Sequence, residues 1–140
     1  MMVIGPEHAL AQLAASLAFA DAGAEPSRIR LYADAGAATG AAPVGGPMAE
    51  ITLAKPCGTI AAGVLTLHPV NQAGAMVLAN GKPQSAHWIN GDGKLVAAGT
   101  VTDMDHGGDF RVEGGTTAPG DESPTLYAGG LVLLGTVVLD

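Results

Sequence analysis

Three carboxylates are close together in the segment Asp103-Met104-Asp105-His106-Gly107-Gly108-Asp109. Carboxylates two residues apart, with glycines that allow the backbone to turn, can supply oxygen ligands to Ca²⁺. The segment departs from an EF-hand loop, because Gly114 stands at the twelfth position, where such a loop has a bidentate acid. We therefore predict a solvated turn between two strands and no bound metal, with Asp103, Asp105 and Asp109 as the candidate ligands to examine.

The other reactive side chains show no catalytic spacing. The chain has a single cysteine, Cys57, and its histidines are His8, His68, His87 and His106. No sequence around Cys57 supports a Cys–His nucleophile pair, and the paired glycines lack the Lys-Ser/Thr that follows a phosphate-binding loop. We therefore expect no enzymatic activity and no cofactor.

Composition excludes some partners and favours others. The 140 residues carry a net charge of −7, and only 14% of them are charged, whereas 48% are hydrophobic and 4% aromatic. An acidic chain without a basic stripe is not expected to bind nucleic acid, and no apolar run is long enough to cross a membrane. So few charges beside so many small apolar residues suggest that other protein chains cover part of the surface.

Short apolar segments are the elements that must position these side chains. They start near residues 28, 50, 59, 75, 85, 95, 109 and 126, and apolar and polar residues alternate within several of them. A spacing of roughly ten residues is typical of an all-β sandwich or barrel. We predict a single domain over residues 1–140, folded as an antiparallel two-sheet sandwich of about eight strands, with a jelly roll as the expected topology.

Three local features accompany the strands. A helix is expected over residues 7–22, where leucines recur on one face and Gly23 can end it. Residues 34–47 form an Ala/Gly/Pro-rich stretch and are expected to be a long flexible loop. Asn90-Gly91-Asp92-Gly93 predicts a tight hairpin turn between strands.

The order of the short motifs is also informative. The chain begins with an Ala-rich helix, which is followed by the strand Arg28-Ile29-Arg30-Leu31-Tyr32, an Ala/Gly/Pro loop and the segment 49–56. After these come the Trp-containing hairpin 86–93, the strand 109–112 and the Gly-Gly-plus-apolar segment 129–139. In this order, over residues 7–139, the chain resembles small virion proteins of tailed bacteriophages. It is most similar among them to capsid cement (decoration) proteins, such as those of short-tailed Bordetella phages.

The resemblance implies a structural role. Proteins of this class are expected to have jelly-roll folds, to bind the outer capsid surface at joints between major capsid subunits, and to stabilise the shell without catalysis. The implied partner is the major capsid protein, and the implied location is the outer surface of a virion assembled in the host cytoplasm. A tail, collar or fibre component is the alternative within virions.

A carbohydrate-binding β-sandwich is the alternative from a different class. Trp88, Tyr32 or Tyr127 would be its stacking platforms, and the 103–109 segment would hold Ca²⁺. An aromatic content of 4% is low for this function.

Self-association is the last expectation from the sequence. Residues 126–139 read as a strand that is apolar on both faces, and a sandwich can bury only one of them. We expect the other face or the helix to form a dimer or higher contact on the particle. The candidate interface residues are Leu10, Leu13 and Leu17 on the helix, and Val132, Leu134 and Val138 on the strand.

Overall fold

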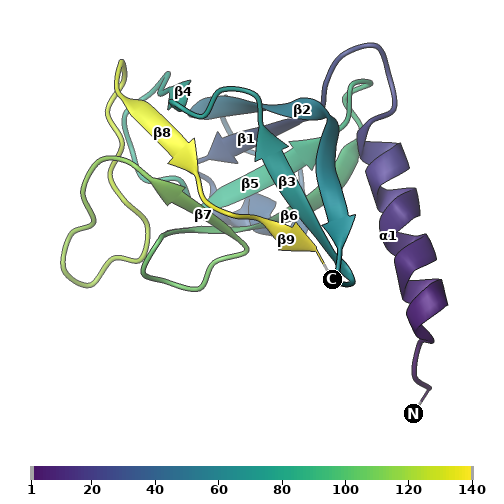
Figure 1. Ribbon diagram of the computed structural model, residues 1–140. Helices are drawn as coiled ribbons and strands as arrows, with labels where there is room; N and C mark the ends of the chain where they lie inside the picture. Colours follow the sequence, from purple (N-terminus) through teal and green to yellow (C-terminus); the bar gives the residue numbers. More distant parts are fainter. Residues whose placement is uncertain (1, 140) are drawn as a thin grey trace.

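The strands hydrogen-bond side by side into one curled sheet. In the computed structural model, which describes residues 2–139 and the side chains of residues 2–137, nine strands follow the order β4-β8-β7-β6-β5-β1-β2-β3-β9 (Figure 1). Their bounds are β1 (Arg28–Tyr32), β2 (Ala49–Ala61), β3 (Val64–Pro69), β4 (Ala75–Met76), β5 (Ser85–Ile89), β6 (Leu95–Asp103), β7 (Phe110–Glu113), β8 (Leu131–Leu134) and β9 (Val138–Leu139). The fold is mostly β, as predicted, with a helix α1 (Pro6–Ala20) at its start.

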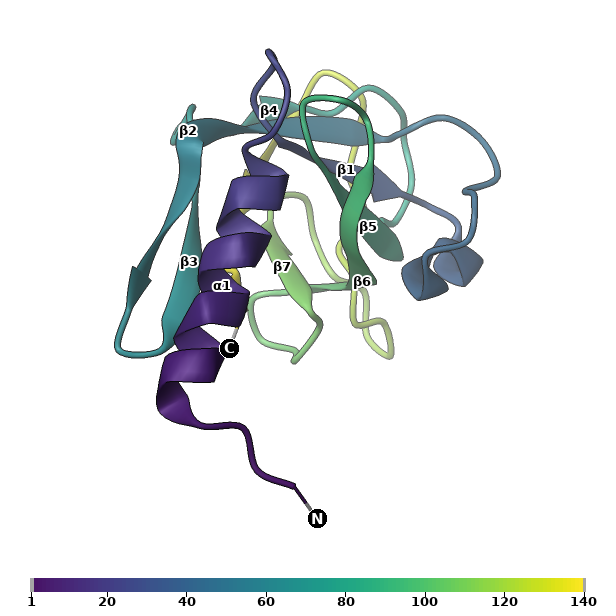
Figure 2. The same cartoon turned by 90° about the vertical axis from the view of Figure 1, so that its right-hand side faces the viewer.

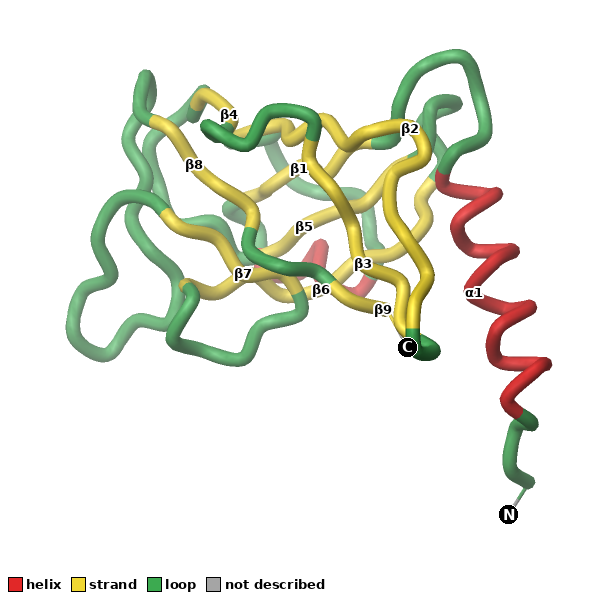
Figure 3. Tube along the Cα trace, viewed as in Figure 1, coloured by secondary structure: helices red, strands yellow, loops and turns green. Residues whose placement is uncertain are grey.

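The sheet differs from the predicted antiparallel two-sheet sandwich. Strands β6 and β7 run parallel, with Val101 opposite Phe110, so the sheet is mixed. It curls like half of a barrel around a single apolar core (Figure 3). At its β4 end the sheet curls back toward the start of β2. The amide of Leu78, two residues after β4, donates a hydrogen bond to the carbonyl of Met48, the residue before β2, at 2.7 Å. The structure therefore does not confirm a sandwich or a jelly roll.

Alternation along β1 and β2 explains which face of the sheet is filled. Ile29 and Leu31 are buried, while Arg28 and Arg30 point outward, because successive side chains of a strand lie on opposite faces. The same rule places Ile51 of β2 inside, directly opposite Ile29. Strand β5 lies between β1 and β6 and is buried along its whole length.

The segments expected near residues 50 and 59 form a single bent strand, β2. Its first part pairs with β1 and its second part with β3, and the register shifts between Leu53 and Gly58. At Gly58 a side-chain carbon would collide with the Thr66 carbonyl oxygen of β3, so only glycine allows this close approach.

Helix α1 covers one end of the curled sheet (Figure 2). Leu13 and Ala20 are buried on its inner face and Leu17 packs against the core, whereas most of its other side chains are exposed. The predicted helix is thus confirmed, and it ends two residues earlier than expected. No helix within residues 2–139 is both long and apolar enough to cross a membrane.

The predicted loop at residues 34–47 contains regular structure. It begins with the 3₁₀ helix η1 (Ala35–Thr39), whose first residues are capped by Asp34. The Asp34 carboxylate accepts hydrogen bonds from the Gly36 and Val44 amides, each at 3.0 Å, so one side chain holds both halves of the loop.

The C-terminal region does not form the single strand expected over residues 126–139. It forms two strands, β8 and β9. Between them, the Gly135 amide donates a hydrogen bond to the Arg111 carbonyl at 2.7 Å. Val132 is fully buried in the core, and Leu131 is exposed on the opposite face. The face assigned outward from the sequence is therefore the inward one, since the pairing of β8 with β4 and β7 decides which face meets the core.

Candidate functional site

Asp103 organises the loop in which the sequence placed metal ligands. Its Oδ1 accepts hydrogen bonds from the amides of Asp105 and His106 and from His106 Nδ1 at 2.6 Å. Its Oδ2 accepts a hydrogen bond from the Thr117 hydroxyl at 2.7 Å. Both carboxylate oxygens thus hold the loop together and join it to the segment after β7.

The other two acidic candidates are not gathered around Asp103. Asp109 Oδ2 accepts hydrogen bonds from the Thr100 amide at 3.1 Å and the Thr100 hydroxyl at 3.3 Å. Asp105 contributes its backbone amide to the turn, and its side chain is exposed. Within the residues that the structure describes, no three His, Cys, Asp or Glu side chains are arranged to hold a metal ion. The loop is a hydrogen-bonded turn between β6 and β7, and a turn at this place between two strands was expected.

Asp103 and His106 shift each other's titration. The hydrogen bonds from His106 and Thr117 lower the pKa of Asp103 to about 2. The Asp103 carboxylate in turn raises the pKa of His106 above its usual value. The pair therefore favours a charged imidazolium–carboxylate contact at the surface.

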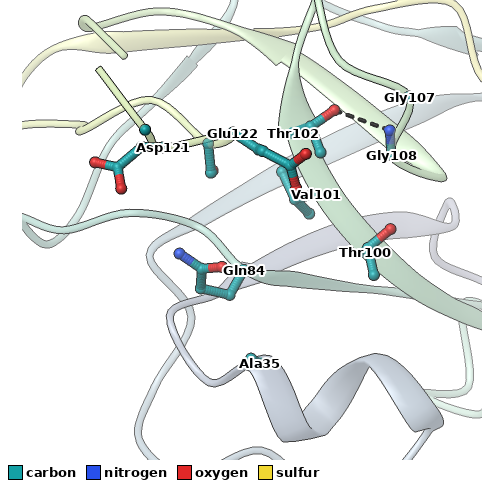
Figure 4. Close-up of a pocket in the computed structure, with 11 residues that line it drawn as sticks. Ala35, Gln84, Thr100, Val101, Thr102, Gly107, Gly108, Asp121 and Glu122 are labelled. Atoms are coloured by element: carbon teal, nitrogen blue, oxygen red, sulfur yellow. Dashed lines mark hydrogen bonds between the residues drawn. The ribbon is translucent and has the colours of Figure 1, made fainter. Parts of the chain in front are cut away.

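A shallow polar groove runs beside this loop (Figure 4). It encloses about 600 Å³ between β6, the turn that precedes β7, and the segment 120–123. Gln84, Asp121 and Glu122 present their side chains around it, and Lys82 Nζ contacts Asp121 Oδ2 at 3.0 Å. The lining consists mainly of hydrogen-bonding and small residues, so this groove can bind polar groups but offers little apolar contact area.

The residues considered for nucleophilic chemistry and sugar stacking lie mostly in the core. Cys57 is buried, and this burial, together with the nearby Asp21 carboxylate, raises the pKa of its thiol to about 11. The rings of Trp88 and Tyr32 are also buried, so neither can serve as the stacking platform that the carbohydrate-binding alternative requires. Tyr127 is exposed.

Two of the histidines also have structural contacts. His87 is buried, and its Nε2 contacts the Ala37 carbonyl of η1 at 2.8 Å. His68 is exposed, and its Nε2 lies 3.0 Å from the Thr59 hydroxyl on the neighbouring strand.

The interface residues predicted from the sequence divide between the core and the surface. Leu13 and Val132 are buried in the chain's own core, and Leu17 and Leu134 pack against it. These four side chains contact the rest of the chain, because α1 closes the end of the sheet and β8 turns this face inward. Leu10 remains 45% exposed. The side chain of Val138 lies outside the part of the chain that the structure describes.

Other exposed apolar side chains were missed in the sequence. Those on the segment before α1, on or just after β4, on β8 and in the turn after β3 are Met2, Val3, Ile4, Val70, Met76, Leu78 and Leu131. The alternation of 75–78 contained the signal: once Val77 is assigned to the core, Met76 and Leu78 must point outward.

A charged cluster lies on the outer face of β1 and β2. Glu50 accepts hydrogen bonds from Arg28 Nη1 at 3.2 Å and from Arg30 Nε at 2.8 Å. Partial burial acts to raise the pKa of Glu50, but the two arginines outweigh it and the pKa is lowered. Two cations against one anion leave this face locally positive in a chain whose net charge is −7.

Comparison of the chain with protein-family models, with curated proteins and with solved structures gives no match.

Proposed function

We propose that this chain is a non-enzymatic structural protein of a tailed-bacteriophage virion. In this proposal it binds the outer capsid surface at joints between major capsid subunits and reinforces the shell. The order of motifs over residues 7–139 is the source of the proposal. The curled β sheet is compatible with it, and the jelly-roll relationship implied by the resemblance remains part of the hypothesis.

The observation that carries the proposal is the amount of apolar surface that this small acidic body exposes. Met2, Val3 and Ile4 precede α1, and Met76 and Leu131 are cross-strand partners on the outer face of β4 and β8. Exposed apolar side chains that lie next to one another are typical of protein–protein contact surfaces. Such contacts, repeated by symmetry, can supply the strength that a shell needs against internal pressure.

Charge also favours an external position. A net charge of −7 opposes binding to packaged DNA, because a protein that contacts phosphates needs clustered Lys and Arg. The polar groove of Figure 4 has the carboxylates of Asp121 and Glu122 at its rim, which also disfavours an anionic ligand.

The test uses capsids assembled without this protein. Purified chain is added to such capsids, and binding is measured by co-sedimentation over a range of protein concentrations. We expect saturable binding and an increase in the temperature at which the capsids break open. Capsids that already carry the protein serve as the control and should bind no more of it.

Absence of binding, or binding without any gain in heat or pressure resistance, would contradict the cement function. An electron-microscopy reconstruction of the complete virion distinguishes the alternatives. Density at the joints between capsid subunits supports the proposal, whereas density confined to the tail, collar or fibres replaces it with the other virion assignment.

A further inference from the structure

The segment before α1, together with the first two residues of the helix, forms an apolar arm, defined here as residues 2–7. It leads away from the curled sheet in both views of the molecule (Figures 1 and 2). Met2, Val3 and Ile4 are 98%, 86% and 53% exposed, and Leu10 continues this apolar surface on the helix. Single exposed apolar residues are ordinary, but consecutive ones on a projecting segment indicate a surface that is covered in use.

A second apolar surface lies at the other end of the molecule. A groove of about 430 Å³, called here the β4 groove, is bounded by β2, the turn after β3, and β4. Val70 and Met76 are the exposed apolar residues of its lining, and Ile51 and Val132 lie beneath them in the core. Glu50, Thr52 and Asn71 add polar groups to the lining. Leu131 is the cross-strand partner of Met76 and continues the apolar surface beyond the rim.

The charges at the two surfaces are complementary. Glu50 lines the β4 groove and pairs with Arg28 and Arg30 of the neighbouring strand β1, so the cluster beside the groove carries two cations and one anion. In the arm, Glu7 follows Ile4 by three residues, at the start of α1. An apolar segment with a carboxylate at its end therefore matches a partly apolar groove with two guanidinium groups beside it.

We propose that the arm of one chain docks in the β4 groove of a second copy of this chain, with Ile4 in the groove and Glu7 facing Arg28 and Arg30. The arm and strand β4, which bounds the groove, lie at opposite ends of the same chain (Figure 1), so a chain does not fill its own groove. The contact is consequently head to tail, and repetition of it gives a ring or an open row of copies. This inference goes beyond the proposed function and is tested without capsids.

The first test measures self-association of the whole chain in solution by sedimentation velocity, over a concentration series that extends into the millimolar range. We expect the average mass to increase with concentration. Ile4→Asp and Met76→Asp should each weaken association about tenfold or more, because each places a carboxylate in an apolar contact. Val44→Asp is the matched control, since Val44 is 83% exposed on the loop at residues 34–47 and should associate like the unchanged chain.

Mixing the two variants distinguishes head-to-tail docking from other contacts. The Ile4→Asp chain keeps an intact groove and the Met76→Asp chain keeps an intact arm, so the mixture should form a heterodimer that grows no further. Glu7→Arg should also weaken association, and the effect of Glu7 should diminish at high salt. A chain that stays monomeric throughout the series, or a mixture that forms no heterodimer, would overturn the proposal and leave a different protein as the occupant of the groove.

A distance measurement locates the contact directly. A nitroxide is attached to a Met2→Cys chain and mixed with an isotope-labelled, unmodified chain. The native Cys57 is buried with a pKa of about 11, so it should not compete for the label at neutral pH. We expect the nitroxide to broaden the amide signals of Val70, Met76 and Leu131 in the isotope-labelled copy. Broadening confined to other surfaces would contradict docking in the β4 groove.

Discussion

Replacement of Asn90 with alanine is expected to lower the free energy of unfolding by about 3 kcal/mol. Asn90 is 1% exposed and lies where β5 enters the hairpin turn. Its Oδ1 accepts hydrogen bonds from the Asp92 amide at 3.0 Å and the Lys94 amide at 2.9 Å. Its Nδ2 donates to the Phe19 carbonyl at 3.2 Å, near the end of α1, so this side chain joins the hairpin to the helix that bears the arm.

The magnitude follows from these three contacts. A hydrogen bond contributes about 1 kcal/mol net, and a buried partner that is left without a bond costs more than this average. Asp92 and Lys94 are exposed, so in the variant their amides can form hydrogen bonds with water. The Phe19 carbonyl near the end of α1 loses its hydrogen bond to the hairpin. The expected loss is therefore about 2–4 kcal/mol, a large part of the stability of a domain of this size.

The assay is urea denaturation followed by the fluorescence of Trp88, which is buried in the core two residues before Asn90. Asp92→Ala is the matched control, because the Asp92 side chain is exposed on the same turn, and its effect should be below about 0.5 kcal/mol. Asn90→Asp keeps the acceptor for the turn but places a carboxylate against the Phe19 carbonyl. It should therefore preserve the hairpin and accelerate hydrogen exchange at the Gly91 amide, which bonds to Ala22 beside the helix.

An unfolding free energy of Asn90→Ala within about 0.5 kcal/mol of the unchanged protein would refute this reasoning. It would mean that water replaces all three contacts without cost and that the end of α1 does not depend on Asn90.

Two further predictions concern the 103–109 loop and α1. The lowered pKa of Asp103 means that its contact with His106 stabilises the loop above the usual carboxyl pKa of 3.8 and is lost as pH falls toward 2. The raised pKa of His106 means that its imidazole is fully protonated below pH 6.5, and that the charged contact is lost as pH rises through the raised value. In an NMR titration, Asp103→Asn should return the pKa of His106 toward 6.5. Leu13→Ala should destabilise the protein by about 2–4 kcal/mol in urea denaturation, because it leaves a cavity under α1. Leu10→Ala, at an exposed position of the same helix, should change stability by less than about 0.5 kcal/mol. Equal effects of the two substitutions would contradict the observed orientation of the helix.

The predictions that succeeded depend on short-range physics. The turn at 90–93 joins two strands as expected, because Asn and Gly accept the backbone conformations of a tight turn wherever the strands lead. Alternation also accounts for Ile29 and Leu31, which share one face of β1 and are both buried. The helix was visible because its leucine spacing and the nearby Gly23 are both local signals, although the helix itself ends at Ala20.

The candidate site was less accessible from the sequence. Proximity along the chain suggested that Asp103, Asp105 and Asp109 act together, but hydrogen bonds within the loop and to Thr100 and Thr117 direct Asp103 and Asp109 to separate partners. Thr117 is fourteen residues from Asp103, in a segment with no strand pattern, so no local rule connects the two.

The sequence by itself determined the β-rich class, the N-terminal helix, the hairpin turn and the acidic, charge-poor surface. Each of these follows from composition or from contacts between residues close together in the chain. Only the tertiary structure decided that the strands form one mixed, curled sheet, that β8 buries Val132 and exposes Leu131, and that apolar surfaces lie at opposite ends of the molecule. A strand that is apolar on both faces satisfies either orientation locally, so the choice depends on which partner strands and which core it meets.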